Sequence, residues 1–147
     1  MSLPTIEVKL EGGRRTYRPG DVLSGEYWIR SSDDQTVRAV ELSVLWYTEG
    51  KGDEDLAVHH FQRLECSSDH PLDMTQPCSF RAVLPNSPLT YEGVLIKIRW
   101  CVRVRVFLGR GKEFFVEEPF QLGAVPSARD LVSAASTIEA SCEASLS

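Results

Sequence analysis

An alternating segment in the C-terminal half of the chain constrains the fold more than any other feature. Every even position from Val94 to Leu108 is apolar. The odd positions between them include four basic residues, Lys97, Arg99, Arg103 and Arg105. Successive side chains of a β-strand point to opposite faces, whereas the 3.6-residue period of a helix would carry the basic side chains into the core. The segment therefore predicts a long strand with an apolar core face and a basic outer face.

Further runs with strand character lie before and after this segment. The run from Val40 to Trp46 alternates in the same way and predicts a second long strand, with Glu41 and Ser43 facing outward. Turn-forming residues separate five shorter candidates. These are Ile6 to Leu10, Val22 to Arg30, Leu56 to Leu64, Cys78 to Leu84 and Lys112 to Glu118. Together the runs predict an all-β, immunoglobulin-like sandwich of about seven antiparallel strands.

The last hairpin can be predicted at the level of its register. Apolar positions of the two strands face the same core only if paired residue numbers have an even sum, and a three-residue loop at Gly109-Arg110-Gly111 satisfies this condition. On the outer face the same register places Arg103 opposite Glu117 and Arg105 opposite Phe115.

Length and composition indicate one domain followed by a tail. A chain of 147 residues with 42% hydrophobic and 25% charged residues is sufficient for a single core. We expect the sandwich to occupy residues 1–125. Residues 126–147 are rich in Ala and Ser and predict a tail that is disordered, forms a short helix or docks on the sandwich.

Charge and hydropathy limit the partners that we expect. A net charge of −5 disfavours nucleic acid as the main partner, and no apolar run approaches the roughly 20 residues of a membrane-spanning helix. The first residues lack the features of a secretory signal, which predicts a cytoplasmic protein. The four cysteines are therefore expected to be free thiols, with a bridge between Cys66 and Cys78 as the alternative if the chain is exported.

The residues that could carry chemistry do not form a recognisable catalytic or metal-binding motif. His59, His60, His70 and Cys66 are the only candidate metal cluster, and adjacent histidines on a strand point to opposite faces. No nucleophile elbow, phosphate-binding loop or zinc-protease motif is present in the sequence. We therefore expect a protein that is not an enzyme and has no catalytic residue, metal or cofactor.

Two features are candidates for binding a partner. The basic row of Lys97, Arg99, Arg103 and Arg105 is suited to an acidic or phosphorylated segment, although cross-strand pairing with Glu117 and its neighbours would equally explain it. Trp28 shares a predicted strand face with polar residues, unlike Trp46 and Trp100, which are in phase with the core. Trp28 is therefore either covered by the tail or exposed to a partner.

Two segments resemble the amino-terminal lobe of the arrestin superfamily, which includes the arrestin-domain-containing adaptor proteins. The segment Tyr17-Arg18-Pro19-Gly20-Asp21-Val22-Leu23-Ser24-Gly25 is similar to the family's Y-x-P-G-[DE]-x-[VL]-x-G motif. The stretch from Leu84 to Gly93, followed by Ile96 to Trp100, resembles its L-P-x-x-x-P-x-[ST]-[YF]-x-G motif and the strand after it. Pro19 and Gly20 also suit a tight turn, and Gly25 in mid-strand indicates a bulge or a close backbone approach.

The resemblance implies an arrestin-like β-sandwich that acts as a non-enzymatic scaffold or adaptor for a protein partner, such as a membrane-protein tail. The sequence has one lobe where the family generally has two, and it lacks the P-P-x-Y segment that recruits ubiquitin ligases. A lobe without its companion predicts either a homodimer or capture of another protein at a free sheet edge. The alternative function is a carbohydrate- or lipid-binding sandwich that uses Trp28.

Overall fold

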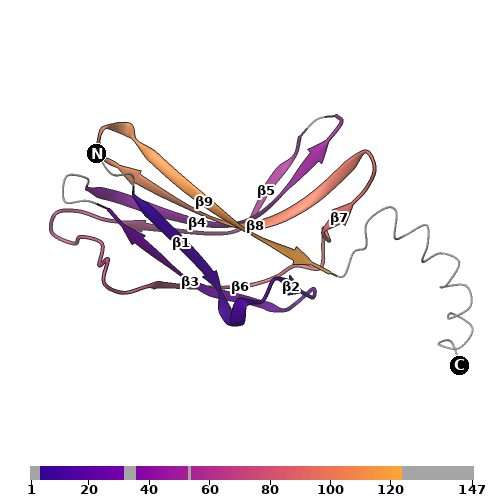
Figure 1. Cartoon of the computed structure of the whole chain (residues 1–147), viewed down its shortest axis with the longest axis horizontal. Coiled ribbons are helices and arrows are strands. Elements are labelled where there is room, and N and C mark those ends of the chain that lie inside the picture. The colour runs from indigo at the N-terminus through magenta and orange to yellow at the C-terminus, as the bar shows by residue number, and fades with distance from the viewer. Residues whose placement is uncertain (1–3, 32–35, 53, 124–147) are drawn as a thin grey trace, which may run out of the picture.

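The computed structural model describes residues 4–31, 36–52 and 54–123, and these residues form two β-sheets packed face to face (Figure 1). The strands are β1 (Thr5–Leu10), β2 (Thr16–Tyr17), β3 (Val22–Arg30), β4 (Val37–Gly50), β5 (Leu56–Glu65), β6 (Cys78–Val83), β7 (Tyr91–Glu92), β8 (Ile96–Leu108) and β9 (Glu113–Leu122). All seven predicted strands are present, so the predicted all-β sandwich is confirmed. The two additional strands, β2 and β7, have two residues each, which is too short for alternation to reveal.

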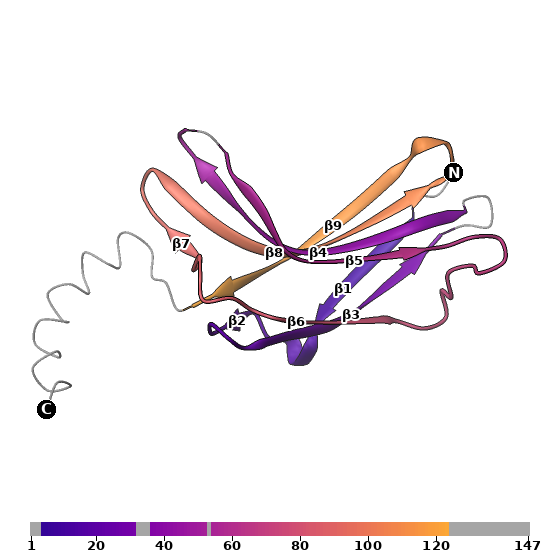
Figure 2. The same cartoon turned by 180° about the vertical axis from the view of Figure 1, so that it is seen from behind.

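The strands divide into a small and a large sheet. The small sheet has the order β1-β3-β6, and the large sheet has the order β2-β9-β8-β4-β5, with β7 paired to the beginning of β8. All pairs are antiparallel except β2–β9. Figure 2, seen from behind, shows the small sheet beneath the middle of the large one, while β5 and the beginning of β8 extend beyond it.

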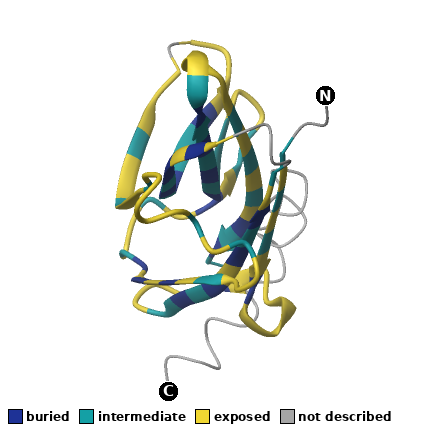
Figure 3. Ribbon diagram, turned by 90° about the vertical axis from the view of Figure 1, so that its left-hand side faces the viewer, coloured by how far each residue is buried: buried dark blue, intermediate teal, exposed yellow. Residues whose placement is uncertain are grey.

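The core fills the space between the sheets, where the facing sides of the strands are buried (Figure 3). The even residues of β4 and β8 meet directly in this layer, as in the pairs Val44–Val102 and Leu42–Val104. Trp100 is 1% exposed in this layer, and its indole Nε1–H donates a 2.8 Å hydrogen bond to the carbonyl oxygen of Pro88. A buried indole needs such an acceptor because an unpaired donor would lose the hydrogen bond that water supplies.

The β8–β9 hairpin has the predicted register. Arg103 pairs with Glu117 and Arg105 pairs with Phe115, and the connection is the three-residue turn Gly109–Gly111. The middle residue, Arg110, has a φ of 66°, so a non-glycine residue takes up one of the left-handed positions in this turn. The even sum required of paired residue numbers, together with the three-residue loop, was therefore sufficient to predict the register of this hairpin.

The prediction that the long strand begins at Val94 is wrong. β8 begins at Ile96, and the side chains of Val94 and Leu95 are 87% and 65% exposed. Together with the end of β4, this part of the chain extends beyond the small sheet, so among the described strands none of the second layer covers its apolar side chains. The buried face of the strand starts at Trp100.

The predicted tail at 126–147 lies outside the described residues, and its disordered, helical and docked forms stay predictions. Within the described ranges, no helix is long and apolar enough to cross a membrane.

The buried row of β4 provides a test of the core. Leu42→Ala, at a position that is 1% exposed, is expected to lower the free energy of unfolding by about 2–5 kcal/mol, because it removes apolar contacts and leaves a cavity. The matched change Leu64→Ala, at a half-exposed position of β5, is expected to cost much less. Chemical denaturation measures both, and equal losses would contradict the assignment of the core.

Candidate functional site

The candidate site is the face of the large sheet that points away from the small sheet. We call it the outer face, and define it by the outward side chains of β4, β5, β8 and β9. Its members include Glu41, Ser43, Leu45, Tyr47, Glu49, Leu56, Val58, Phe61, Arg63, Lys97, Arg99, Cys101, Arg103, Arg105, Phe115 and Glu117. The sheet is bent, and the outer face lies on its concave side (Figure 1).

The centre of the outer face is apolar and buried without belonging to the main core. Leu45 and Cys101 pair directly across β4 and β8 and are only 1% and 2% exposed. Neither belongs to the buried cluster between the sheets. Their burial therefore comes from neighbouring side chains on the concave face. Burial also raises the pKa of the Cys101 thiol to about 12, with a further contribution from the carboxylate of Glu117.

Sequence reasoning missed this apolar centre, although the sequence contains a signal for it. Leu45 and Cys101 each interrupt an otherwise alternating strand with three consecutive apolar residues, Val44 to Trp46 and Trp100 to Val102. Two such interruptions that pair across neighbouring strands would indicate an outer face with an apolar centre. Four further apolar side chains, each about half exposed, lie on the same face. They are Leu56, Val58, Phe61 and Phe115.

Three members of the basic row are already paired with carboxylates. Arg103 donates from Nε and Nη2 to Glu117 at 3.0 and 2.7 Å. Arg99 lies 3.0 Å from Glu49 and 2.9 Å from Glu92, and Glu92 is also 3.6 Å from the ammonium group of Lys97. These contacts agree with the cross-strand pairing interpretation of the row.

Arg105 differs from the other members of the row. It lies between Glu41 of β4 and Phe115 of β9, but the Glu41 carboxylate accepts a hydrogen bond from Arg63. Within the described residues, Arg105 forms no ion pair, and its buried Nε has no hydrogen-bond acceptor. The neighbouring Phe115 ring is 53% exposed and lies 5.4 Å from the guanidinium carbon of Arg103. The two arginines and Phe115 thus form a compact surface cluster.

Trp28 does not share a site with the basic row. It lies on β3, on the outward side of the small sheet, which is the opposite face of the sandwich. The Lys9 ammonium group is 5.7 Å from the centroid of its ring, and Trp28 lines a shallow hollow of about 610 Å³ together with Glu26, Ser79 and Arg81. The predicted binding residues therefore belong to two separate surfaces.

The histidines and the cysteine of the candidate metal cluster lie on β5 and in the connection that follows it. A β-bulge leaves His59 unpaired on β5, and its Nε2–H donates to the carbonyl oxygen of Val83 at 2.7 Å. The Nδ1 of His70 lies 2.8 Å from the carbonyl oxygen of Asp69. Cys66 and Cys78 line one hollow as free thiols, and Cys142 lies outside the described residues. Among the described residues, no three potential ligands are placed to hold a metal ion.

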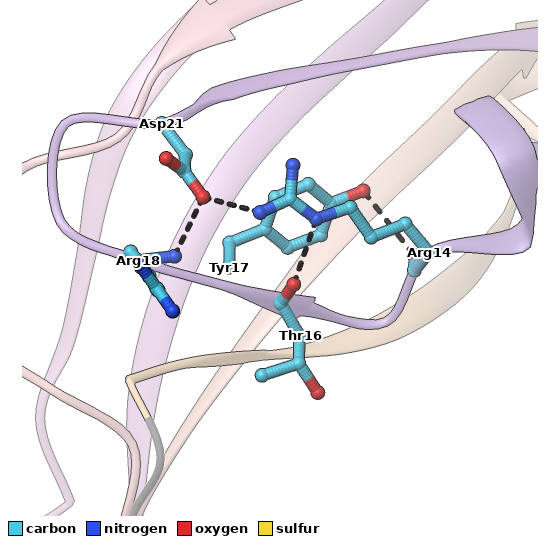
Figure 4. Close-up of polar contacts among 5 residues, drawn as sticks. All are labelled: Arg14, Thr16, Tyr17, Arg18 and Asp21. Carbon is cyan, nitrogen blue, oxygen red and sulfur yellow. Dashed lines mark hydrogen bonds and ion pairs between the residues drawn. The ribbon is translucent and has the colours of Figure 1, made fainter.

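The residues from Arg14 to Asp21, which run through β2 toward β3, form a compact polar turn (Figure 4). The Asp21 carboxylate accepts hydrogen bonds from the backbone N–H of Arg18, at 2.9 Å, and from the guanidinium of Arg14. The Arg14 guanidinium stacks 4.4 Å from the ring centre of Tyr17 and donates from Nε to the carbonyl oxygen of Thr16 at 2.9 Å. The hydrogen bonds lower the pKa of Asp21 below its usual value. Aspartate is therefore suited to this position because one carboxylate satisfies two donors.

The close approach predicted at Gly25 is also present. A Cβ atom there would lie 2.3 Å from the carbonyl oxygen of Lys9 and 2.8 Å from the ring of Phe80. Pairing of β3 with β6 continues through this residue without a register shift, so the glycine marks close packing and not a bulge.

The Asp21 turn predicts a pH-dependent stability. Asp21→Asn is expected to lower the melting temperature at pH 7, because it removes the charge that Arg14 and the Arg18 N–H stabilise. Because the pKa of Asp21 is lower in the folded protein, this stabilisation is present above the ordinary value of 3.8 and is lost as pH falls through the folded-state value. Calorimetry from pH 7 downward should show the gap between the two proteins closing in acid, and a constant gap would contradict the mechanism.

The buried centre of the outer face predicts an inert thiol. With a pKa of about 12, Cys101 is ionised in only about one molecule in ten thousand at pH 8. Iodoacetamide should therefore leave Cys101 unmodified in the folded protein, react with it after denaturation, and modify the less buried Cys66 sooner. Peptide mass mapping measures each site, and rapid alkylation of Cys101 in the native protein would show that the centre is open.

Comparison with known proteins supports the fold and assigns no family. No family model matches the chain, and no curated protein matches it in sequence. Among solved structures, the fold is similar to that of Spo0M, a sporulation control protein from Bacillus subtilis, with a TM-score of 0.63 and 16% sequence identity. The match covers 94% of this chain and 56% of the Spo0M chain. At this identity the likeness establishes a shared β-sandwich fold.

Proposed function

We propose that the chain is an arrestin-like scaffold that binds a protein partner on the outer face of its large sheet. One observation carries the proposal, namely the half-exposed Phe115 held between Arg103 and Arg105. Aromatic residues and arginines are enriched at protein interfaces, where a few of them supply most of the binding energy. The apolar centre at Leu45 and Cys101 adjoins this cluster.

Arg105 indicates which chemical group the partner carries. Within the described residues the Arg105 guanidinium has no carboxylate partner, so its charge is free to pair with a carboxylate or phosphate of a partner. Arg99 and Arg103 already hold carboxylates of their own chain, so they would shape the surface and receive no new anion. The partner is accordingly an acidic or phosphorylated segment with apolar side chains beside its charged group.

The arrestin-like segments are compatible with an adaptor role. The turn at Arg14 to Asp21 fixes the entry into β3, and the stretch from Leu84 to Gly93 contains β7 and leads into β8. Backbone hydrogen bonds join the two segments, from the Gly20 N–H to the Leu84 carbonyl oxygen and from the Leu84 N–H to the Asp21 carbonyl oxygen, and neither segment contributes a residue to the outer face as defined above. The adaptor role, the absence of catalysis and a cytoplasmic location are parts of this proposal.

A carbohydrate- or lipid-binding function would use the opposite surface. The hollow beside Trp28 has polar groups on its rim, but Trp28 is the only tryptophan, tyrosine or histidine among its described lining residues, and Lys9 lies near its ring. Carbohydrate platforms commonly use several exposed rings. We therefore rank this function second.

The proposal is tested by affinity capture with variants of the two surfaces. Arg105→Glu and Phe115→Ala are each expected to reduce recovery of the same captured proteins by about tenfold or more, the loss typical of a residue central to binding. Arg81→Glu and Trp28→Ala make matched changes on the small sheet and should leave recovery unchanged. Quantitative mass spectrometry supplies the readout, after circular dichroism has shown that each variant is folded.

Two results would count against the outer face. Full recovery with Arg105→Glu would remove the basic cluster from binding. Loss with Trp28→Ala and Arg81→Glu, but not with Phe115→Ala, would transfer the function to the hollow on the small sheet.

A further inference from the structure

The two sides of the sandwich differ in how their strand edges are covered. On one side, β2 pairs with the end of β9, and Arg15 lies 3.3 Å from Glu118 beneath β1. On the other side, β5 ends the large sheet and β6 ends the small one. The His59 imidazole binds the Val83 carbonyl of β6. Within the described residues, no strand pairs with the open edge of β5.

The register identifies the backbone groups that this edge leaves open. The N–H of Cys66 bonds to the carbonyl oxygen of Arg38 at 2.8 Å, across a directly opposed pair. Hydrogen-bonded and non-bonded pairs alternate along an antiparallel ladder, so Leu64, Gln62 and His60 also bond toward β4. Phe61 and Arg63 therefore point their N–H and C=O groups away from the sheet. These groups need an acceptor or a donor, either from water or from another strand.

The side chains at this edge are also unusual for an exposed strand. Phe61 is 51% exposed, and Leu56, Val58 and Leu64 are exposed to a similar degree. The charge of Arg63 is already satisfied by Glu41 and Glu65. Exposed edges are normally protected by unpaired charges, and here the one cation in the straight part of the strand is neutralised.

We infer that β5 pairs antiparallel with β5 of a second copy of this chain, about a two-fold axis at Gln62. In this register Phe61 lies opposite Arg63 of the second copy, and His60 lies opposite Leu64. Backbone hydrogen bonds form between Phe61 of each copy and Arg63 of the other. The two six-stranded sheets become one continuous sheet.

Among the registers in which two copies of β5 could pair, the one centred on Gln62 places the most compatible side chains opposite each other. Centring the axis on Arg63 would place two guanidinium groups opposite each other, and like charges at directly opposed positions are destabilising. Centring it on Phe61 would extend the pairing into the bulge at His59. The register centred on Gln62 uses only residues 60–64, and it places each arginine beside an aromatic ring. Arg63 already makes such a contact within the chain, 5.4 Å from the centroid of Phe107.

A second copy therefore fits the edge in charge and in hydrogen bonding. The pairing does not depend on the proposed function, because it uses the open edge of β5 and not the cluster around Phe115. A dimer of this kind would present two outer faces on one sheet, and the two sites would lie on the same side.

Sedimentation velocity from micromolar to millimolar protein tests the dimer. The wild-type chain should approach twice the monomer mass as its concentration rises. Arg63→Pro should stay monomeric, because proline removes an outward N–H and places its ring at the pairing edge, while the ladder to β4 is kept. Arg63→Ala is the matched control, since it loses the same ion pairs and keeps the N–H, and it should still dimerise.

A disulfide at the two-fold axis tests the register. Gln62 would face its own copy in a non-hydrogen-bonded pair, where Cα atoms lie about 4.5 Å apart, within the range that a disulfide spans. Gln62→Cys should form a cross-linked dimer with oxidised glutathione. Leu64→Cys should not, because its two copies would lie roughly 13 Å apart along the strand. Peptide mapping distinguishes these links from those of the native cysteines.

The outcomes of these experiments support or overturn the proposed β5–β5 dimer. A monomer at all concentrations, with no cross-link at position 62, would overturn it and leave the edge to a segment of another protein. A dimer that persists in Arg63→Pro would also overturn it, because the contact would then lie elsewhere. Loss of partner capture by Phe115→Ala together with an unchanged dimer would separate this inference from the proposed function.

Discussion

The antiparallel pairing of β4 with β8 is the interaction on which the rest of the structure depends. These strands, of 14 and 13 residues, run beside each other from Val37–Leu108 to Gly50–Ile96. Their even residues provide the middle of the core against the small sheet. Since side chains alternate, the same register also fixes the order of side chains on the outer face. A slip by one residue would move the arginines into the core, so the apolar row and the basic row constrain each other.

Electrostatics on the outer face follow from this register. Glu49 pairs directly with Lys97 and lies beside Arg99, and Glu117 lies opposite Arg103. Lys97, Arg99 and Arg103 therefore contribute little free positive charge, and surface ion pairs of this kind add little stability. Arg105 is the exception because Arg63 takes up the carboxylate of Glu41. The four basic side chains therefore differ in whether a carboxylate pairs with them, although they occupy equivalent positions in the alternating sequence pattern.

The sequence predicted those parts of the fold that depend on local pattern. Alternation located all seven longer strands, and loop parity fixed the pairs Arg103–Glu117 and Arg105–Phe115 because the hairpin closes over three residues. Pairing of Arg99 with Glu49 joins segments 50 residues apart, and no local rule gives that register. The error at Val94 has a similar origin, since alternation shows which side of a strand is apolar but not where the opposing sheet ends. Similarly, the separation of Trp28 from the basic row depends on which sheet each strand joins.

The bulge at His59 connects the two edges on the open side of the sandwich. An extra residue in an edge strand changes the direction of its side chain, and here it allows the imidazole to reach both the Val83 carbonyl and the edge of the Trp100 ring, 6.1 Å away between centroids. One edge of the small sheet is thereby covered by a side chain of the large sheet. The bulge also shifts the register with which β5 pairs to β4, so the straight, unprotected part of that strand is limited to the residues after it. His59, whose side chain covers the edge of the small sheet at β6, therefore also marks where the straight part of the open β5 edge begins.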